Sequence, residues 1–411
     1  MIMTKAADDE KAFHENMSWE SGSSLYRRTS LAEDLLTWAV HCGAADLHLT
    51  VGKVPVLRVN GNLCELPELL SSECEPVSRV TRDLVGIWPS LNGPITPSQA
   101  EEIARSLLRD KRHSEVFAAK GNVDLAYAIP GLSRFRVNVY RQRGSYAVAC
   151  RVLADRVPDL QELFPYSPGW VAVMRRLAGL TRGLVLVTGP TGSGKSTTLA
   201  AMVDYINSSF KKHIITLEDP VEYLHRHKLG IVNQREVGED VESFAEGLRA
   251  ALREDPDVIM VGEMRDMETI ATAITAAETG HLVFSTLHTN TASETVDRII
   301  DVFPPHQQQQ IRVQLASVLR GVISQQLLPR KNGQGLVCAV EMLVGTHAVK
   351  ALIRENKTHQ LSSVLQTGLQ DGMVPLERSL ADMVAGGLVA REVAMDRAYD
   401  PRLLVRYLDR K

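Results

Sequence analysis

Hydrophobic residues are spaced differently in the two halves of this chain. From residue 183 onward, short apolar runs alternate with segments in which apolar residues recur every three or four positions. The apolar runs are 184–188, 214–217, 258–261 and 282–286. Short apolar runs are typical of buried strands, and the second spacing is typical of amphipathic helices. The alternation predicts an α/β fold, a mostly parallel sheet with helices on both faces.

The first half has a different pattern, which predicts a small α+β domain. A helix is expected after Ser30, because Ser30 and Glu33 have the spacing of a capping box and apolar residues then recur at helical intervals. Alternating residues predict strands, and Asn60-Gly61 has the composition of a hairpin turn. The predicted strands are 46–50, 55–60, 62–66, 123–129, 133–140 and 145–153, with a further helix over 99–111.

These patterns divide the chain into four segments. Residues 1–28 show no sustained periodicity and are expected to be a disordered tail. The small domain is predicted over 29–160, a Pro- and Gly-containing linker over 161–170, and the large domain over 171–411. A stretch with four prolines, 71–98, is interpreted as an insertion or long loop. The end of the large domain is expected to be helical, over 348–355, 362–367 and 376–386.

Composition narrows the class of protein. The chain has 411 residues, 44% of them hydrophobic and 23% charged, which is typical of a soluble protein of two or more domains. Its formal net charge of −3 gives no reason to expect stable nucleic-acid binding. No apolar stretch approaches the roughly 18 residues that cross a bilayer, and the polar N-terminus does not resemble a secretory signal. Five separate cysteines form no C-x-x-C pair, so neither a zinc knuckle nor a disulfide framework is indicated. An intracellular protein is expected.

The strongest chemical signal is a phosphate-binding loop. The pattern G-x-x-x-x-G-K-S follows the apolar run 184–188 and precedes a helix-like segment, which argues against a glycine turn without a ligand. Its backbone N–H groups would surround a polyphosphate, its lysine would reach the outer phosphates, and its serine hydroxyl would bind Mg²⁺. The predicted ligands are therefore ATP and Mg²⁺. The candidate nucleotide-binding residues are Gly189, Pro190, Thr191, Gly192, Ser193, Gly194, Lys195, Ser196 and Thr197.

Carboxylates follow two of the predicted strands. Glu263 comes just after the run 258–261, at the sheet edge where ligands of such folds bind, and we expect it to act on the magnesium side. Glu218, Asp219 and Glu222 follow the run 214–217. Glu222 is our candidate for activating water, with Glu218 as an equal alternative. The alternative for Glu218, Asp219 and Glu222 is a role in helix capping and surface charge, and for Glu263 that of a solvated loop carboxylate.

Histidines and arginines complete the candidate set. His288 leaves the run 282–286 at the same sheet edge, so contact with the γ-phosphate or the water is plausible, more so than for His281. Arg136, with Arg134 beside it in the alternation, and Arg151 lie on strands of the small domain. They suit arginine fingers in a neighbouring subunit's site, a nucleic-acid stripe, or simply solvated strand charges.

The motifs together resemble those of the type II/IV secretion ATPases, specifically the PilT-type twitching-motility branch. The similarity extends from about residue 31 to 400. It is carried by segments 189–202, 217–223, 232–237, 251–257, 261–266, 276–281 and 285–289.

The resemblance implies a small PAS-like N-terminal domain joined to a RecA-like ATPase domain, assembled as a homohexamer. It also implies residue roles. Lys195 and Ser196 would form the Walker A motif, Asp219 and Glu222 the acidic box with Glu222 as catalytic glutamate, Glu263 the Walker B acid, His281 and His288 the histidine box, and Arg136 and Arg151 a source of charge at the nucleotide. Mg²⁺ would be held by Ser196, by Glu263 partly through water, and by Asp219.

Two further features point to a branch of that family. Assembly ATPases of the PilB and GspE type carry a four-cysteine zinc module after the histidine box, whereas residues 326–341 contain only Cys338. Residues 348–355 resemble the C-terminal retraction motif, with departures at Lys350 and Ala351. The expected function is pilus retraction by a cytoplasmic ring that meets the inner face of the membrane through a platform protein. The alternative is an ATPase that energises a conjugative or type IVB secretion system.

Overall fold

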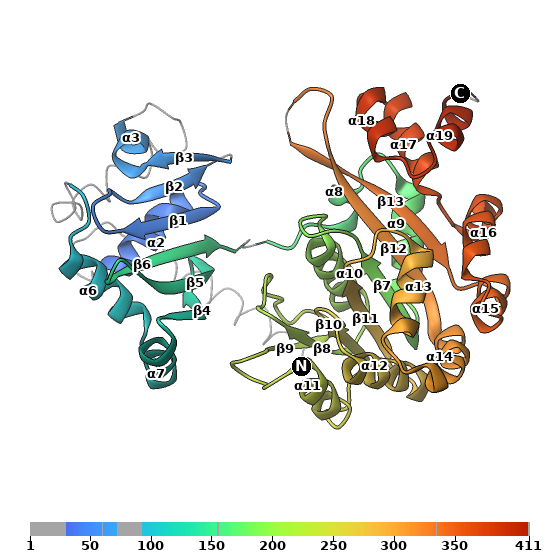
Figure 1. Ribbon diagram of the computed structural model, residues 1–411, viewed down its shortest axis with the longest axis horizontal. Helices are drawn as coiled ribbons and strands as arrows, with labels where there is room; N and C mark the ends of the chain where they lie inside the picture. Colours follow the sequence, from blue (N-terminus) through green and yellow to red (C-terminus); the bar gives the residue numbers. More distant parts are fainter. Residues whose placement is uncertain (1–29, 60, 72–92, 154–155, 334, 410–411) are drawn as a thin grey trace, which may run out of the picture. The chain divides into compact units, whose positions relative to one another are not determined.

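The chain folds into two compact units, Met1–Val152 and Leu153–Lys411. The structure, a computed structural model, describes residues 30–59, 61–71, 93–153, 156–333 and 335–409 (Figure 1). The predicted tail and most of the predicted insertion at 71–98 lie outside these residues. Among the described residues, no helix is both long and apolar enough to cross a membrane.

The small unit is an antiparallel sheet covered by helices on one face. The six strands are ordered β3-β2-β1-β6-β5-β4. Along β5 the side chains of Phe135, Val137 and Val139 are fully buried, while Arg136 between them is exposed, so the apolar positions alone face the core. The elements are α2 (Leu31–His41), β1 (Asp46–Thr50), β2 (Val56–Val59), β3 (Asn62–Glu65), α3 (Leu66–Ser71), α6 (Pro97–Leu107), α7 (Lys111–Lys120), β4 (Asn122–Ile129), β5 (Ser133–Gln142) and β6 (Ser145–Val152).

Local sequence signals account for much of this unit. Ser30 and Glu33 form both hydrogen bonds of the predicted capping box at the start of α2. Strands β2 and β3 pair as the predicted hairpin, with Val59 opposite Asn62. The helix predicted over 99–111 is instead two helices, because Asp110 caps a new one, α7.

The large unit is built on a seven-stranded sheet with the order β13-β12-β7-β11-β10-β8-β9. All neighbouring strands are parallel except β12 and β13. Every residue of β7 is buried, and its side chains alternate between two cores: Val185 and Val187 belong to one, and Leu184 and Leu186 to the other. Helices therefore cover both faces of the sheet, which confirms the predicted α/β fold.

The strands and helices of the large unit alternate along most of its length (Figure 1). Its elements are α8 (Leu160–Leu163), α9 (Pro168–Ala178), β7 (Gly183–Thr188), α10 (Lys195–Ser209), β8 (His213–Glu218), β9 (Ile231–Glu236), α11 (Phe244–Ala251), β10 (Val258–Val261), α12 (Met267–Thr279), β11 (Leu282–Leu287), α13 (Ala292–Asp301), α14 (Pro305–Val318), β12 (Leu319–Pro329), β13 (Leu336–Val344), α15 (His347–Arg354), two 3₁₀ turns at Thr358–Gln360 and Leu369–Asp371, α16 (Leu361–Thr367), α17 (Leu376–Ala385), α18 (Arg391–Arg397) and α19 (Pro401–Leu408).

Two features of the large unit differ from the sequence-based expectation. Residues 161–170, predicted as a linker, form most of α8 and the start of α9, and Phe164 and Trp170 are buried in a core of the large unit. The junction between the units lies earlier, between Val152 and Leu153. Strands β9, β12 and β13 were not predicted either. In β12 the reason is that Gly321 and the glutamines Gln325 and Gln326 interrupt the apolar pattern.

Candidate active site

The phosphate-binding loop joins the buried strand β7 to helix α10. Gly189 has φ 142°, and a Cβ atom there would lie 2.4 Å from the carbonyl oxygen of Gln325 on β12. Gly194, at the N-cap of α10, has φ 87°. A side chain is therefore excluded at Gly189 by space and disfavoured at both positions by the backbone conformation. Gly189 is therefore required by its close packing against β12, and Gly194 by its backbone conformation.

The loop has the properties of an anion site. Helix α10 begins without a side-chain hydrogen bond at its N-cap, which leaves its first N–H groups for a ligand. The Ser193 hydroxyl is buried and has no hydrogen-bond partner among the described residues, and Ser196 is exposed. An unpartnered buried hydroxyl beside uncapped N–H groups fits a bound phosphate.

The side chain of Lys195 lies against the phosphate-binding loop. Its side chain is buried, and Nζ donates to the carbonyl oxygens of Gly189, at 2.8 Å, and Pro190, at 3.0 Å. Burial lowers the pKa of Lys195, while the charges of Glu263 and Glu222 act in the opposite direction. Both carboxylates are therefore close enough to influence the charge of the lysine of the loop.

Glu263 and His288 meet at the carboxyl edge of the sheet. Glu263 follows β10, and its Oε1 lies 2.7 Å from Nε of Arg265, while its Oε2 lies 3.3 Å from Nε2 of His288, which follows β11. The parallel pairing of β10 and β11 brings the two residues together. Arg265 was not singled out from the sequence, although its place two residues after Glu263 was a usable signal.

The two candidates for water activation have different surroundings. Glu218, at the end of β8, is 8% exposed and accepts hydrogen bonds from Thr216 Oγ1 at 2.7 Å and Gln234 Nε2 at 3.0 Å. Burial raises the pKa of Glu218, the largest of its influences. The Glu222 side chain is exposed, and its backbone N–H donates to Glu218 at 3.4 Å. The Glu218 carboxylate is thus occupied by hydrogen bonds within the protein, whereas the Glu222 carboxylate is accessible to solvent.

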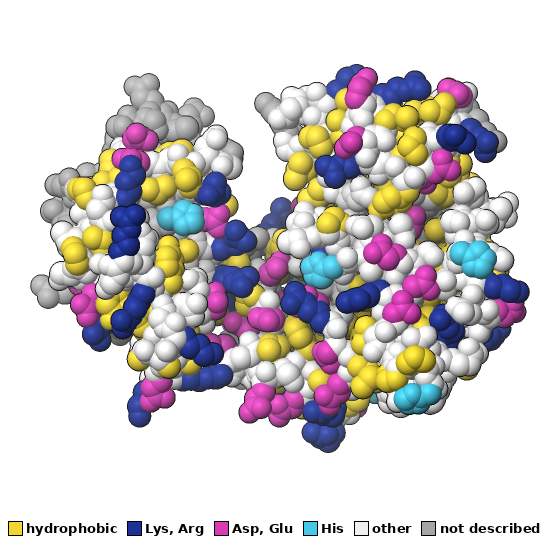
Figure 2. Space-filling view, in the orientation of Figure 1, with side chains coloured by type: hydrophobic (Ala, Val, Ile, Leu, Met, Phe, Trp, Pro, Cys, Tyr) yellow, Lys and Arg dark blue, Asp and Glu magenta, His cyan; other side chains and the backbone are white. Residues whose placement is uncertain are grey.

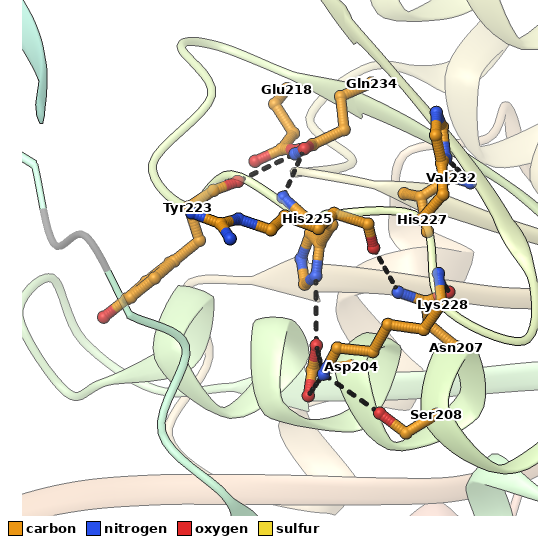
Figure 3. A network of polar contacts seen from close by, with 11 residues as sticks. Asp204, Asn207, Ser208, Glu218, Tyr223, His225, His227, Lys228, Val232 and Gln234 are labelled. Carbon is orange, nitrogen blue, oxygen red and sulfur yellow. Dashed lines mark hydrogen bonds and ion pairs between the residues drawn. The ribbon is translucent and has the colours of Figure 1, made fainter. Parts of the chain in front are cut away.

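A polar network fixes the segment that carries Glu222 (Figure 3). Asn207 on α10 donates from Nδ2 to the carbonyl of Arg226 at 2.7 Å and accepts from the N–H of Lys228 at 3.2 Å. Lys228 also forms an ion pair with Asp204 on α10 at 2.8 Å, and Thr197 Oγ1 lies 3.0 Å from the hydroxyl of Tyr223. The β8–β9 segment is therefore attached to the helix that starts at the phosphate-binding loop.

The remaining predicted residues are placed as follows. Asp219 is exposed directly after β8. His281 precedes β11 and contacts the carbonyl of Ala276 through Nδ1 at 3.0 Å. It lies at the amino end of the strand, roughly 20 Å from the edge where His288 lies. The structure thus separates the two histidines and keeps only His288 with the candidate site.

The arginines lie on the open face of the small unit's sheet. Arg136 on β5 is opposite Arg151 on β6, and both are exposed. Arg151 Nε is 2.8 Å from Asp46, which also lies 3.4 Å from Arg58. On the face seen in Figure 2, basic and acidic side chains are interspersed among the described residues.

The geometry defines a class of protein, the P-loop nucleotide hydrolases, and comparison with known proteins identifies the family. Residues 132–389 match the model of the type II/IV secretion system protein family. The chain belongs to this family and is an ATP-hydrolysing enzyme.

The relatives include proteins of pilus retraction. The chain is 44% identical over 368 residues to the type IV pilus retraction ATPase PilT of Pseudomonas aeruginosa, covering 90% of this chain and 98% of that protein. It is 46% identical over 328 residues to a twitching motility protein of Neisseria gonorrhoeae, covering 79% and 84% of the two chains. A solved structure of the pilus retraction motor PilT with bound ADP has a TM-score of 0.78 at 43% identity, covering 92% of this chain and 100% of that one.

Proposed function

We propose that the protein is a homohexameric motor that hydrolyses ATP to retract type IV pili. The observation that carries this proposal is the convergence of Lys195, Glu222, Glu263 and His288 at one edge of the large sheet, in a chain that resembles retraction ATPases over nearly its whole length.

The phosphate-binding loop would hold the polyphosphate of ATP. Backbone N–H groups at the start of α10 and the Ser193 hydroxyl would donate to phosphate oxygens, and Lys195 would exchange its contacts with Gly189 and Pro190 for the outer phosphates. Breaking two backbone contacts to reach a ligand is favourable because the new partner carries a full negative charge.

The residues around the loop suit Mg²⁺ held mostly by phosphates and water. Among the described residues, no three His, Cys, Asp or Glu side chains form a metal cluster. The protein would contribute Ser196, Glu263, partly through water, and Asp219. Bound Mg²⁺ would neutralise charge on the phosphate oxygens.

Hydrolysis needs a residue that orients water and a source of positive charge. Glu222 would accept the proton of the attacking water, because it is accessible while Glu218 is committed. His288, held by Glu263, would contact the γ-phosphate or that water, and Arg136 and Arg151 would supply charge to the transferred phosphoryl group.

Motion of the ring would then drive a platform protein at the inner face of the membrane. The test is a chromosomal Glu222→Gln substitution in the native host, with the exposed Glu242→Gln as matched control. We expect cells that keep surface pili but lose twitching motility, and normal twitching in the control. Normal twitching in the Glu222→Gln strain, with loss of DNA or effector transfer instead, would favour the secretion alternative.

A further inference from the structure

The C-terminal segment of the large unit contacts the loop that carries His288. This loop, residues 288–291, joins β11 to α13 and is named here the β11–α13 loop. Tyr399 lies between α18 and α19, more than 100 residues later, and its hydroxyl donates to the carbonyl oxygen of Asn290 at 2.9 Å. The same hydroxyl accepts from Nε2 of Gln326 on β12 at 2.7 Å. One side chain therefore ties β12 and the C-terminal helices to this loop.

The other end of the loop is also held by this part of the chain. The N–H of Ala292 donates to Oε1 of Glu341 on β13 at 2.8 Å, and Glu341 is buried. The N–H of Asp400, next to Tyr399, donates to the buried Glu377 on α17 at 3.0 Å. The backbone is thus anchored next to both partners of the Tyr399–Asn290 hydrogen bond, at Ala292 and at Asp400. The position of the loop therefore depends on residues outside the catalytic edge.

The bridge forms part of a pocket beside the phosphate-binding loop. The pocket has a volume of about 580 Å³. Its lining includes Gly192 and Ser193 of the phosphate-binding loop together with Asn290, Gln326 and Tyr399. A ligand bound against the phosphate-binding loop would therefore lie next to the hydrogen bond between Tyr399 and Asn290.

We propose that Tyr399 is a positioning residue that sets the place of His288 by fixing the β11–α13 loop to β12 and the C-terminal helices. The proposal rests on the proposed function, since it takes His288 to act at the γ-phosphate or the water. It predicts that loss of the Tyr399 hydroxyl lowers kcat for ATP hydrolysis and leaves KM for ATP nearly unchanged. Because a neutral hydrogen bond is lost at each of two partners, the expected decrease is about two- to tenfold.

The test compares Tyr399→Phe with Tyr166→Phe in the full-length protein. Tyr166 is a matched control, because its hydroxyl also donates to a backbone carbonyl, that of Cys338 at 2.8 Å, and Cys338 is not part of the β11–α13 loop. We expect both variants to lose a similar amount of thermal stability, and only Tyr399→Phe to lose turnover. Hydrogen exchange supplies a second measurement: amides 287–295 should exchange faster in Tyr399→Phe and at the wild-type rate in Tyr166→Phe.

Three outcomes would overturn the proposal. One is unchanged exchange at 287–295 in Tyr399→Phe, and another is a raised KM with unchanged kcat, which would make Tyr399 only a wall of the pocket. The third is an equal loss of kcat in Tyr166→Phe. Failure of the proposed function would look different, because the Glu222→Gln strain would then twitch normally, whatever the exchange at 287–295 in Tyr399→Phe.

Discussion

The two sheets of this protein present charged residues in different ways. In the large unit the central strands β7, β11 and β10 are parallel and fully buried, so Glu263 and His288 lie where the chain leaves the sheet. In the small unit the strands are antiparallel with one open face, and Arg136 and Arg151 lie within neighbouring strands, opposite one another. A parallel sheet covered by helices offers its edge to a ligand, whereas an open antiparallel sheet offers its face.

The charged residues of the two units also differ in the contacts that hold them. Glu263 contacts both Arg265 and His288, and Lys195 is buried, so the site of the large unit is fixed by local contacts before any ligand binds. Arg151 is paired with Asp46 on its own sheet, and Arg136 is exposed. The catalytic contribution of the large unit should therefore be intrinsic, and that of the small unit should depend on assembly.

The largest effect is expected for Lys195→Ala. The variant loses the charge that reaches the outer phosphates and leaves a gap beside Gly189 and Pro190. ATP hydrolysis should fall below detection in a phosphate-release assay, and nucleotide should no longer raise the melting temperature. Full turnover in this variant would remove the assignment of the site to the large unit.

Arg136→Ala tests the small unit's face. If this arginine supplies charge to the transferred phosphoryl group, kcat should fall by about 10³-fold or more, the range measured for arginine fingers. Arg58→Ala is the control, since Arg58 lies in the same sheet and pairs with Asp46. The comparison fails if both variants hydrolyse ATP at the wild-type rate under conditions where the hexamer forms.

Glu222→Gln and Glu218→Gln sharpen the comparison within the large unit. A general base contributes about 10²- to 10⁴-fold, so Glu222→Gln should lower kcat by that amount and leave thermal stability unchanged. Glu218→Gln should retain more of the turnover, because the amide still accepts from Thr216 or Gln234. Steady-state kinetics of the purified variants would decide, and the reverse order would make Glu218 the water activator.

The smallest effect is on the pH dependence of stability. Burial raises the pKa of Glu341 from its usual 4.5 to about 7. The folded state therefore binds this proton more tightly than the unfolded state. The stabilisation of the folded state by protonated Glu341 is fully present below about pH 4.5 and is lost as the pH rises through about 7. At pH 8 the loss is about 3 kcal/mol, at about 1.4 kcal/mol for each pKa unit.

Glu341→Gln checks this prediction, because glutamine keeps an oxygen acceptor for the N–H of Ala292. Denaturant unfolding at pH 5 and pH 8 should show a smaller decrease in stability for the variant than for the wild type. Equal decreases in the two proteins would mean that Glu341 does not titrate in this range.

Local sequence patterns predicted most of the strands and the composition of the site. The phosphate-binding loop between β7 and α10, and the acids that follow β8 and β10, were identified because each follows a short apolar run. Helix α2 and its capping box were likewise local signals. Residues 161–170 were predicted as a linker because they include two prolines and a glycine, although Phe164 and Trp170 are buried in a core.

By itself, the sequence predicted which side chains would bind a triphosphate and activate water, because spacing within a motif is a property of a few consecutive residues. Only the tertiary structure decided which of them work together. It buried Glu218 and left Glu222 accessible, placed His281 at the opposite end of β11 from His288, and brought Tyr399 to Asn290. Those outcomes depend on strand order and on packing between distant segments, which no local pattern of residues encodes.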